Sequence, residues 1–156
     1  MAIEIERKFL VRNSNWSTGD AGISCRQGYV PSTGDFTVRV RTADDRAYIA
    51  VKQRRAGISR AEYEYEIPVD DAVEMLAGLD QSGIVEKTRY KVPFGGLVWE
   101  VDVFSGENKG LIVAEVELDS EDQSFELPDW AGREVTEKPQ YLNINLSRNP
   151  YSRWRE

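Results

Sequence analysis

Charged side chains alternate with apolar ones along most of the extended segments of this sequence. Because side chains two apart on a strand point to the same side, each such segment carries one ionic and one apolar face. One ionic stripe is usually a solvated outer surface that discourages aggregation. Several together favour a wide barrel with its ionic faces inside. The stripes are Glu4/Glu6/Lys8, Arg39/Arg41, Lys52/Arg54, Arg60/Glu62/Glu64/Glu66, Lys87/Arg89/Lys91, Glu100/Asp102 and Glu115/Glu117.

An interior that holds both acids and bases suits one kind of chemistry. Arginine and lysine bind phosphoryl oxygens, and arginine can do so with two parallel hydrogen bonds. Clustered carboxylates hold Mg²⁺ or Mn²⁺, which prefer oxygen ligands. Phosphoryl transfer depends mainly on positioning and charge stabilisation, and a metal can activate the attacking water. The residue types therefore predict a metal-assisted reaction of a polyanionic phosphate.

The composition removes several competing chemistries. The 156 residues include no histidine, which excludes a Ser-His-Asp triad, a histidine base and histidine-ligated zinc. The one cysteine, Cys25, excludes an internal disulfide and fits a reducing cytosol. The net charge of -7 argues against nucleic acid and anionic membranes as partners. The N-terminus carries acids where a signal peptide needs bases, so we expect a cytoplasmic protein.

Most of the chain is expected to form strands. The period is 2, the residues are β-branched and aromatic, and glycines mark the turns between segments. Eight strands in a chain of this length predict either a closed antiparallel barrel or a two-sheet sandwich. The expected strands are residues 3–11, 23–30, 35–42, 46–54, 60–67, 84–93, 97–104 and 111–118.

Few helices are expected beside the strands. Two acidic residues followed by apolar residues at helical spacing predict a short helix over residues 70–81. A C-terminal helix is expected over residues 139–147, after Pro139. Residues 121–127 are ambiguous, because their acidic residues could open a further helix. The expected fold class is therefore mainly β, with a few flanking helices.

The first stripe, Glu4-Ile-Glu6-Arg-Lys8, matches the Glu-x-Glu-x-Lys signature that opens the CYTH superfamily, the triphosphate tunnel metalloenzymes. The closing segment also resembles that of the family, but it reads Lys138-Pro-Gln-Tyr141 where members often have Asp-Pro-Arg-Tyr. This departure puts in doubt any role of the missing aspartate and arginine. The segments that follow in the family's order are Val38–Arg41, Val51–Lys52, Arg60–Glu64, Lys87–Tyr90, Trp99–Phe104 and Ala114–Glu117.

The resemblance spans almost the whole chain and implies a single CYTH domain over residues 1–156. It implies an eight-stranded antiparallel closed β-barrel that forms a tunnel around a triphosphate. Members of the family hydrolyse inorganic triphosphate or thiamine triphosphate, or cyclise ATP as class IV adenylate cyclases. The lead before Glu4 is shorter than in such cyclases. We therefore expect hydrolysis of inorganic triphosphate to diphosphate and phosphate.

The resemblance also assigns roles to residues. Lys8, Glu4 and Glu64 are expected to act in catalysis, with Lys8 orienting the phosphate or the water. Two ions of Mg²⁺ or Mn²⁺ are expected on the acids Glu4, Glu6, Glu62, Glu115 and Glu117. The substrate-binding bases, with Lys87 and Arg54 as additions to the matched positions, are Lys8, Arg39, Arg41, Lys52, Arg54, Lys87 and Arg89.

Several alternatives remain open at this stage. A thiamine or nucleoside group would need an aromatic wall at a tunnel mouth. The available rings, which more often pack in a core, are Trp16, Trp130, Trp154, Tyr29 and Tyr141. A non-catalytic polyphosphate- or nucleotide-binding module would keep the bases but could lose the acids. The expected partner is a small molecule with a triphosphate, and the apolar outer face leaves room for a homodimer.

Overall fold

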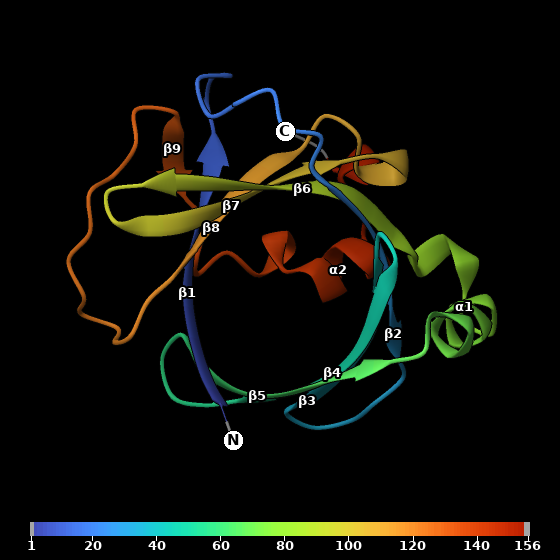
Figure 1. The fold of residues 1–156 in the computed structure, drawn as a ribbon. Helices are drawn as coiled ribbons and strands as arrows, with labels where there is room; N and C mark the ends of the chain where they lie inside the picture. The colour runs from blue at the N-terminus through green and yellow to red at the C-terminus, as the bar shows by residue number, and fades with distance from the viewer. Residues whose placement is uncertain (1, 155–156) are drawn as a thin grey trace.

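Eight antiparallel strands close into a barrel in the computed structural model, which describes residues 2–154 (Figure 1). Their hydrogen-bonding order is β5-β4-β3-β2-β6-β7-β8-β1, and the pairing of β5 with β1 closes the ring. The predicted barrel is therefore confirmed, whereas the two-sheet sandwich is not formed. The strands are β1 (Ala2–Val11), β2 (Ile23–Val30), β3 (Phe36–Ala43), β4 (Arg46–Arg54), β5 (Ser59–Ile67), β6 (Val85–Phe94), β7 (Leu97–Phe104) and β8 (Ile112–Glu117).

Local sequence explains why these strands begin and end where they do. The β6–β7 hairpin turns through Gly95 and Gly96, whose φ angles are 60° and 79°. Two consecutive positive φ angles define the tight turn that matches the twist of paired strands, and glycine adopts them without strain. Each observed strand lies within two residues of its predicted limits. Residues 1, 155 and 156, which the expected single domain includes, lie outside the described residues.

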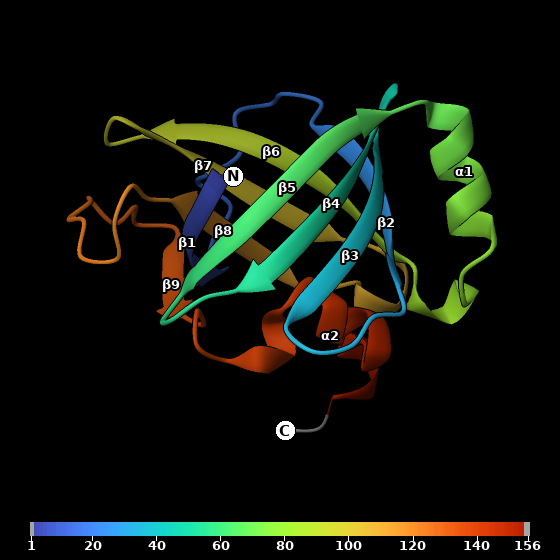
Figure 2. The ribbon, with the colours of Figure 1, turned by 90° about the horizontal axis from the view of Figure 1, so that it is seen from below.

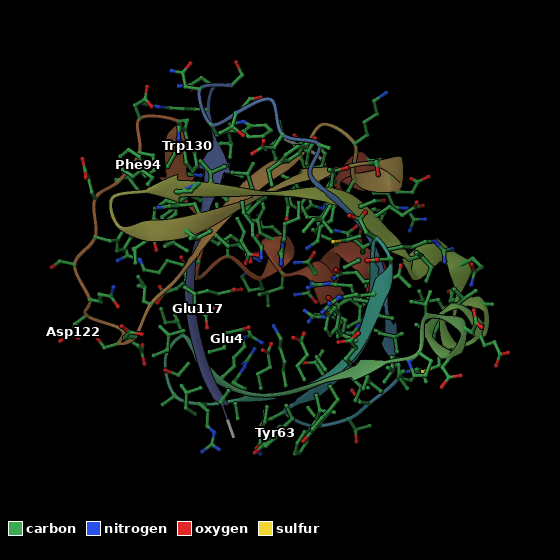
Figure 3. The ribbon with its side chains drawn as sticks, viewed as in Figure 1. Glu4, Tyr63, Phe94, Glu117, Asp122 and Trp130 are labelled. Atoms are coloured by element: carbon green, nitrogen blue, oxygen red, sulfur yellow. The ribbon has the colours of Figure 1, made fainter. Side chains whose placement is uncertain are left out.

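The apolar faces of the strands point outward and are covered in part, while Ile3, Phe36 and Tyr65 stay exposed. Helix α1 (Val69–Ala77) packs Ala72 and Leu76 on Val40 and Ala47 of the barrel wall. Elsewhere the segment after β8 folds back, and its Phe125 and Trp130 pack on Trp99. Trp130 lies outside the barrel wall in Figure 3. The hydrophobic core therefore surrounds the barrel, and the interior is left for charged side chains.

Two expected helices have other limits than predicted, and the ambiguous residues 121–127 form no helix. The helix expected over 70–81 ends at Ala77, because the chain turns at Gly78, and a separate 3₁₀ turn follows at Gln81–Gly83. Residues 121–127 form a turn and an extended segment, since packing on the barrel fixes them instead of a helix. The helix expected over 139–147 is split into a 3₁₀ turn, Pro139–Tyr141, and α2, Asn143–Arg148.

A ninth strand was not predicted. β9 (Ala131–Glu134) pairs with β1 outside the ring, on the edge of β1 opposite β8. It has four residues, including a glycine, so it carries no period-2 pattern. This segment is extended because it pairs with the free edge of β1, and not because of its own sequence.

The C-terminal segment covers one end of the barrel. Figures 1 and 2 show α2 lying across the end opposite the open mouth. Its Leu146 is buried in a cluster with Val85, Phe104 and Val113. The short turn Tyr151–Arg153 follows it. No helix described between residues 2 and 154 is long and apolar enough to cross a membrane.

Candidate active site

The strand registers bring the ionic stripes together inside the barrel. Glu6 lies opposite Glu117, and Lys8 opposite Glu115, across β1 and β8. Figure 3 shows Glu4 and Glu117 pointing into the barrel, whereas Tyr63 points away from it. The interior holds a cavity of about 320 Å³ at the open end. Its charged lining residues are Glu4, Glu6, Arg39, Arg41, Lys52, Glu62, Glu64, Arg89, Lys91, Glu100, Glu115 and Glu117.

One side of this cavity carries guanidinium groups with unused donors. Arg41 donates from Nε to Gln27 Oε1 over 2.9 Å and forms no ion pair with any residue between 2 and 154. Burial and the neighbouring charges of Arg39 and Arg89 lower the pKa of Arg41 to about 10. Arg39 contacts Glu64 over 3.1 Å, but its buried Nε has no hydrogen-bond partner in the described part of the chain. Buried donors without partners are costly, so this wall is built for an anion.

The facing wall is acidic. Burial, with repulsion from Glu115 and Glu4, raises the pKa of Glu6 to about 8. The pKa of Glu117 is raised by burial and by nearby carboxylates, and that of Glu4 is raised by burial and by Glu62. These carboxylates therefore oppose one another's ionisation, and a cation between them would relieve that repulsion.

The acidic wall fits an ion such as Mg²⁺, which needs only a few ligands from the protein. Within residues 2–154, no three acidic, cysteine or histidine side chains converge on one point as a complete metal cage. Mg²⁺ does not need one, because it usually takes one or two carboxylates and completes its shell with waters and substrate phosphates. The residues that could hold it are the cavity acids Glu4, Glu6, Glu62, Glu115 and Glu117.

Two lysines neutralise part of this wall. Lys52 Nζ lies 2.9 Å from Glu4 and 3.3 Å from Glu62, between the two carboxylates. Lys8 Nζ lies 3.4 Å from Glu115 and donates to the carbonyl oxygen of Tyr141 over 3.2 Å. Lys8 thereby ties the acidic wall to the segment that covers the barrel end. Burial opposes the charge on Glu115, but Lys8 and Arg89 outweigh it and hold its pKa well below the usual value.

A buried ion-pair network stands behind the basic wall. Asp102 is fully buried and accepts hydrogen bonds from Lys87 over 2.8 Å and from Arg89 over 2.7 Å. Burial alone would raise the pKa of Asp102, but these two cations lower it. Burial lowers the pKa of Lys87 to about 8 despite this partner. Asp102 therefore orients Arg89 toward the cavity, and Lys87 does not line the cavity itself.

Sequence reasoning assigned no role to some of these residues. The stripe Glu100/Asp102 indicated that Asp102 faces inward, but not that it would hold Lys87 and Arg89. Asn143 accepts from Lys87 Nζ over 3.2 Å and lines the cavity. Tyr48 lines it too. No local pattern marks Asn143, because its position depends on α2 folding across the barrel.

The other expected residues lie away from the main cavity. Arg54 lines a separate pocket at the end covered by α2. Of the rings considered for stacking, Trp16 packs on Tyr90 at a centroid distance of 5.0 Å. Tyr29 accepts a hydrogen bond from Gln27 in a narrow part of the tunnel. The packed rings Trp130, Tyr141 and Trp154 contact other aromatic side chains.

A profile of the CYTH domain family matches residues 2–150. The chain belongs to the CYTH domain family. It is 50% identical over 156 residues to "Inorganic triphosphatase" of Acetivibrio thermocellus, with 100% of both chains covered. It is 42% identical over 150 residues to "Inorganic triphosphatase" of Nitrosomonas europaea, covering 92% of this chain and 96% of the relative. The crystal structure of the inorganic triphosphatase NE1496 superposes with a TM-score of 0.67, at 38% identity, over 94% and 95% of the two chains.

Proposed function

We propose that this protein is an enzyme that hydrolyses inorganic triphosphate to diphosphate and orthophosphate in the barrel cavity. The observation that carries the proposal is the buried guanidinium cluster, in which, among residues 2–154, Arg41 has no acidic partner and Arg39 Nε has no hydrogen-bond partner. A polyanion of phosphates supplies what these donors lack. The two relatives named inorganic triphosphatase, which match at 50% and 42% identity, support the same substrate.

The residues divide the work by charge. Arg39, Arg41 and Arg89 bind phosphoryl oxygens, and the fixed position of Arg89 on Asp102 reduces the reorganisation needed in the transition state. Lys8 orients the phosphate or the attacking water, while Glu64 positions Arg39. We assign Mg²⁺ or Mn²⁺, as two ions, to the acidic wall. When bound, the metal would stabilise charge on the phosphoryl oxygens and activate water.

If a metal ion binds the acidic wall, we expect it to displace Lys52. Lys52 occupies the space between Glu4 and Glu62 at distances of 2.9 and 3.3 Å. A divalent ion on the same carboxylates would compete with this ammonium group. Lys52 is then available to the substrate, which is the role that its match to the family implies.

The cavity favours inorganic triphosphate over thiamine triphosphate and ATP through its size and lining. Its volume of about 320 Å³ lies at the lower limit of small-molecule sites. Tyr48 is the aromatic side chain that lines this cavity among residues 2–154, and Tyr29 lies in the adjoining narrow space, so the cavity itself offers a thiamine or adenine ring one stacking partner. Inorganic triphosphate needs no such wall, and it is the simplest substrate that satisfies the charges.

The test is product formation from inorganic triphosphate, thiamine triphosphate, ATP and diphosphate, each with Mg²⁺, with Mn²⁺ and with a chelator. We expect metal-dependent phosphate release from inorganic triphosphate, and its loss when the chelator is present. Cyclic AMP from ATP would instead establish a cyclase. Faster turnover of thiamine triphosphate would establish a thiamine triphosphatase. Binding without turnover of any substrate would establish a binding module.

Three further assignments belong to the proposal. We assign residues 1–156 to a single domain, since the strands from both halves of the chain close one ring. The single free cysteine, Cys25, fits a reducing compartment, and a cytoplasmic location stays a prediction. A homodimer through the apolar outer face, with no nucleic acid or membrane partner, stays a prediction as well.

A further inference from the structure

A second pocket lies at the end of the barrel that α2 covers. It has a volume of about 230 Å³ and opens between the β4–β5 turn and the segment 136–142. Three bases line it, Lys8, Arg54 and Arg60, against two acids, Glu6 and Glu137. It is therefore a smaller and more basic space than the main cavity, where acids outnumber bases.

Arg54 and Arg60 have an unusual relation to each other. They lie directly opposite in the register of β4 and β5, on the inward phase of both strands. Like charges in opposite positions of a strand pair are destabilising. Among the described residues, neither guanidinium forms an ion pair or a side-chain hydrogen bond. An anion held between them would remove the repulsion and use donors that the protein leaves free.

Shared lining residues connect the second pocket with the main cavity. A narrow space of about 60 Å³ lies between them. It shares Arg39, Lys52 and Asn143 with the main cavity, and Lys8, Arg60 and Leu142 with the second pocket, while Glu6 lines all three spaces. An anion that leaves the basic wall of the main cavity therefore meets four bases on its way toward the covered end, with Glu6 as the one acid that lines the narrow space among the described residues.

We propose that this second pocket is an orthophosphate site through which product leaves the tunnel, opposite the open mouth that admits the substrate. The inference rests on the proposed function, because hydrolysis supplies the orthophosphate. Arg54 and Arg60 are the binding residues, and Lys8 connects them to the reacting end of the cavity. The predicted role of Arg54 changes accordingly, from holding substrate to holding product.

The test compares Arg54→Gln/Arg60→Gln with the control Arg26→Gln/Arg46→Gln. The control removes the same two charges, but Arg26 pairs with Gln81 and Arg46 with Glu66, outside the pocket. Initial rates of triphosphate hydrolysis are followed by diphosphate formation while inorganic phosphate is added. Separately, inorganic phosphate is added to the metal-free proteins and the shift in melting temperature is recorded. Arg54→Gln alone, at an exposed side chain, repeats both measurements with minimal risk to folding.

In the wild type we expect phosphate inhibition that excess triphosphate does not relieve. In the double variant the phosphate inhibition constant should rise at least about tenfold, because two charge-assisted hydrogen bonds are lost, while KM for triphosphate stays within about twofold. Most of the phosphate-dependent melting shift should also disappear, and the control should keep both effects. An unchanged inhibition constant, a purely competitive pattern, or a tenfold rise in KM overturns the proposal. A wild type that binds phosphate in this pocket without hydrolysing triphosphate refutes the enzyme and leaves the site standing.

Discussion

Glu6 offers the sharpest test of the electrostatics of the acidic wall. Its pKa of about 8 compares with an ordinary value of 4.5. At about 1.4 kcal/mol per pH unit, this difference corresponds to about 5 kcal/mol of stability. Because Glu6 lies on the cavity wall, where water screens it, we take this figure as a ceiling and expect a few kcal/mol. The substitution Glu6→Gln keeps the shape and removes the titration.

The sign of the pH dependence follows from whether the folded or the unfolded protein keeps the Glu6 proton. Unfolded Glu6 releases its proton near pH 4.5, whereas folded Glu6 keeps it until about pH 8. The folded metal-free protein therefore binds more protons in this window, and its free energy of unfolding falls as pH rises from 4.5 to 8. Glu6→Gln has no such group, so its stability advantage over the wild type should grow across the window.

Urea denaturation with a chelator present, at pH 5, 6, 7 and 8, measures this difference. Glu74→Gln, on the exposed face of α1, is the control and should follow the wild type at each pH. Added Mg²⁺ should reverse the trend in the wild type, since a cation favours the charged carboxylate. A difference between Glu6→Gln and wild type that stays constant from pH 5 to 8 would refute the assigned electrostatics.

Three other substitutions test the remaining parts of the site. Lys8→Ala should lower the rate of triphosphate hydrolysis by orders of magnitude with the fold intact, as assayed by phosphate release and circular dichroism; Lys109→Ala is its exposed control. Arg41→Gln should raise KM for triphosphate at least about tenfold, because a charge-assisted phosphate contact is lost, while the ligand-free protein keeps or gains thermal stability. Lys87→Met should destabilise the protein by about 3–5 kcal/mol in urea denaturation, because it leaves the buried Asp102 with one partner fewer.

Each of these expectations can be contradicted separately. Full activity of Lys8→Ala would remove that lysine from the reaction. An unchanged KM in Arg41→Gln would mean that the unpaired guanidinium does not meet the substrate. For the buried network, Lys87→Met/Asp102→Asn should recover part of the lost stability. A double variant no more stable than Lys87→Met alone would show that the two residues are not coupled.

The sequence by itself determined the strands and the side of each strand that is charged. Alternation is a local property, so Glu4, Glu6 and Lys8 share a face wherever their strand pairs. The signature at these residues also indicated the family and, through it, the barrel. The helix limits and β9 could not be predicted in the same way, because Gly78, the packing of the segment after β8 and the edge of β1 decide them.

Only the tertiary structure decided which charges meet. The register across β6 and β7 places Asp102 against Lys87 and Arg89, so Lys87 becomes buried support and Arg89 faces the cavity. The same closure gathers Glu4, Glu6 and Glu117, whose pKa values rise through burial and the repulsion of neighbouring carboxylates. Local alternation specifies only the face of a strand, whereas charge energetics depend on distance and burial. Those quantities exist only once the ring has closed.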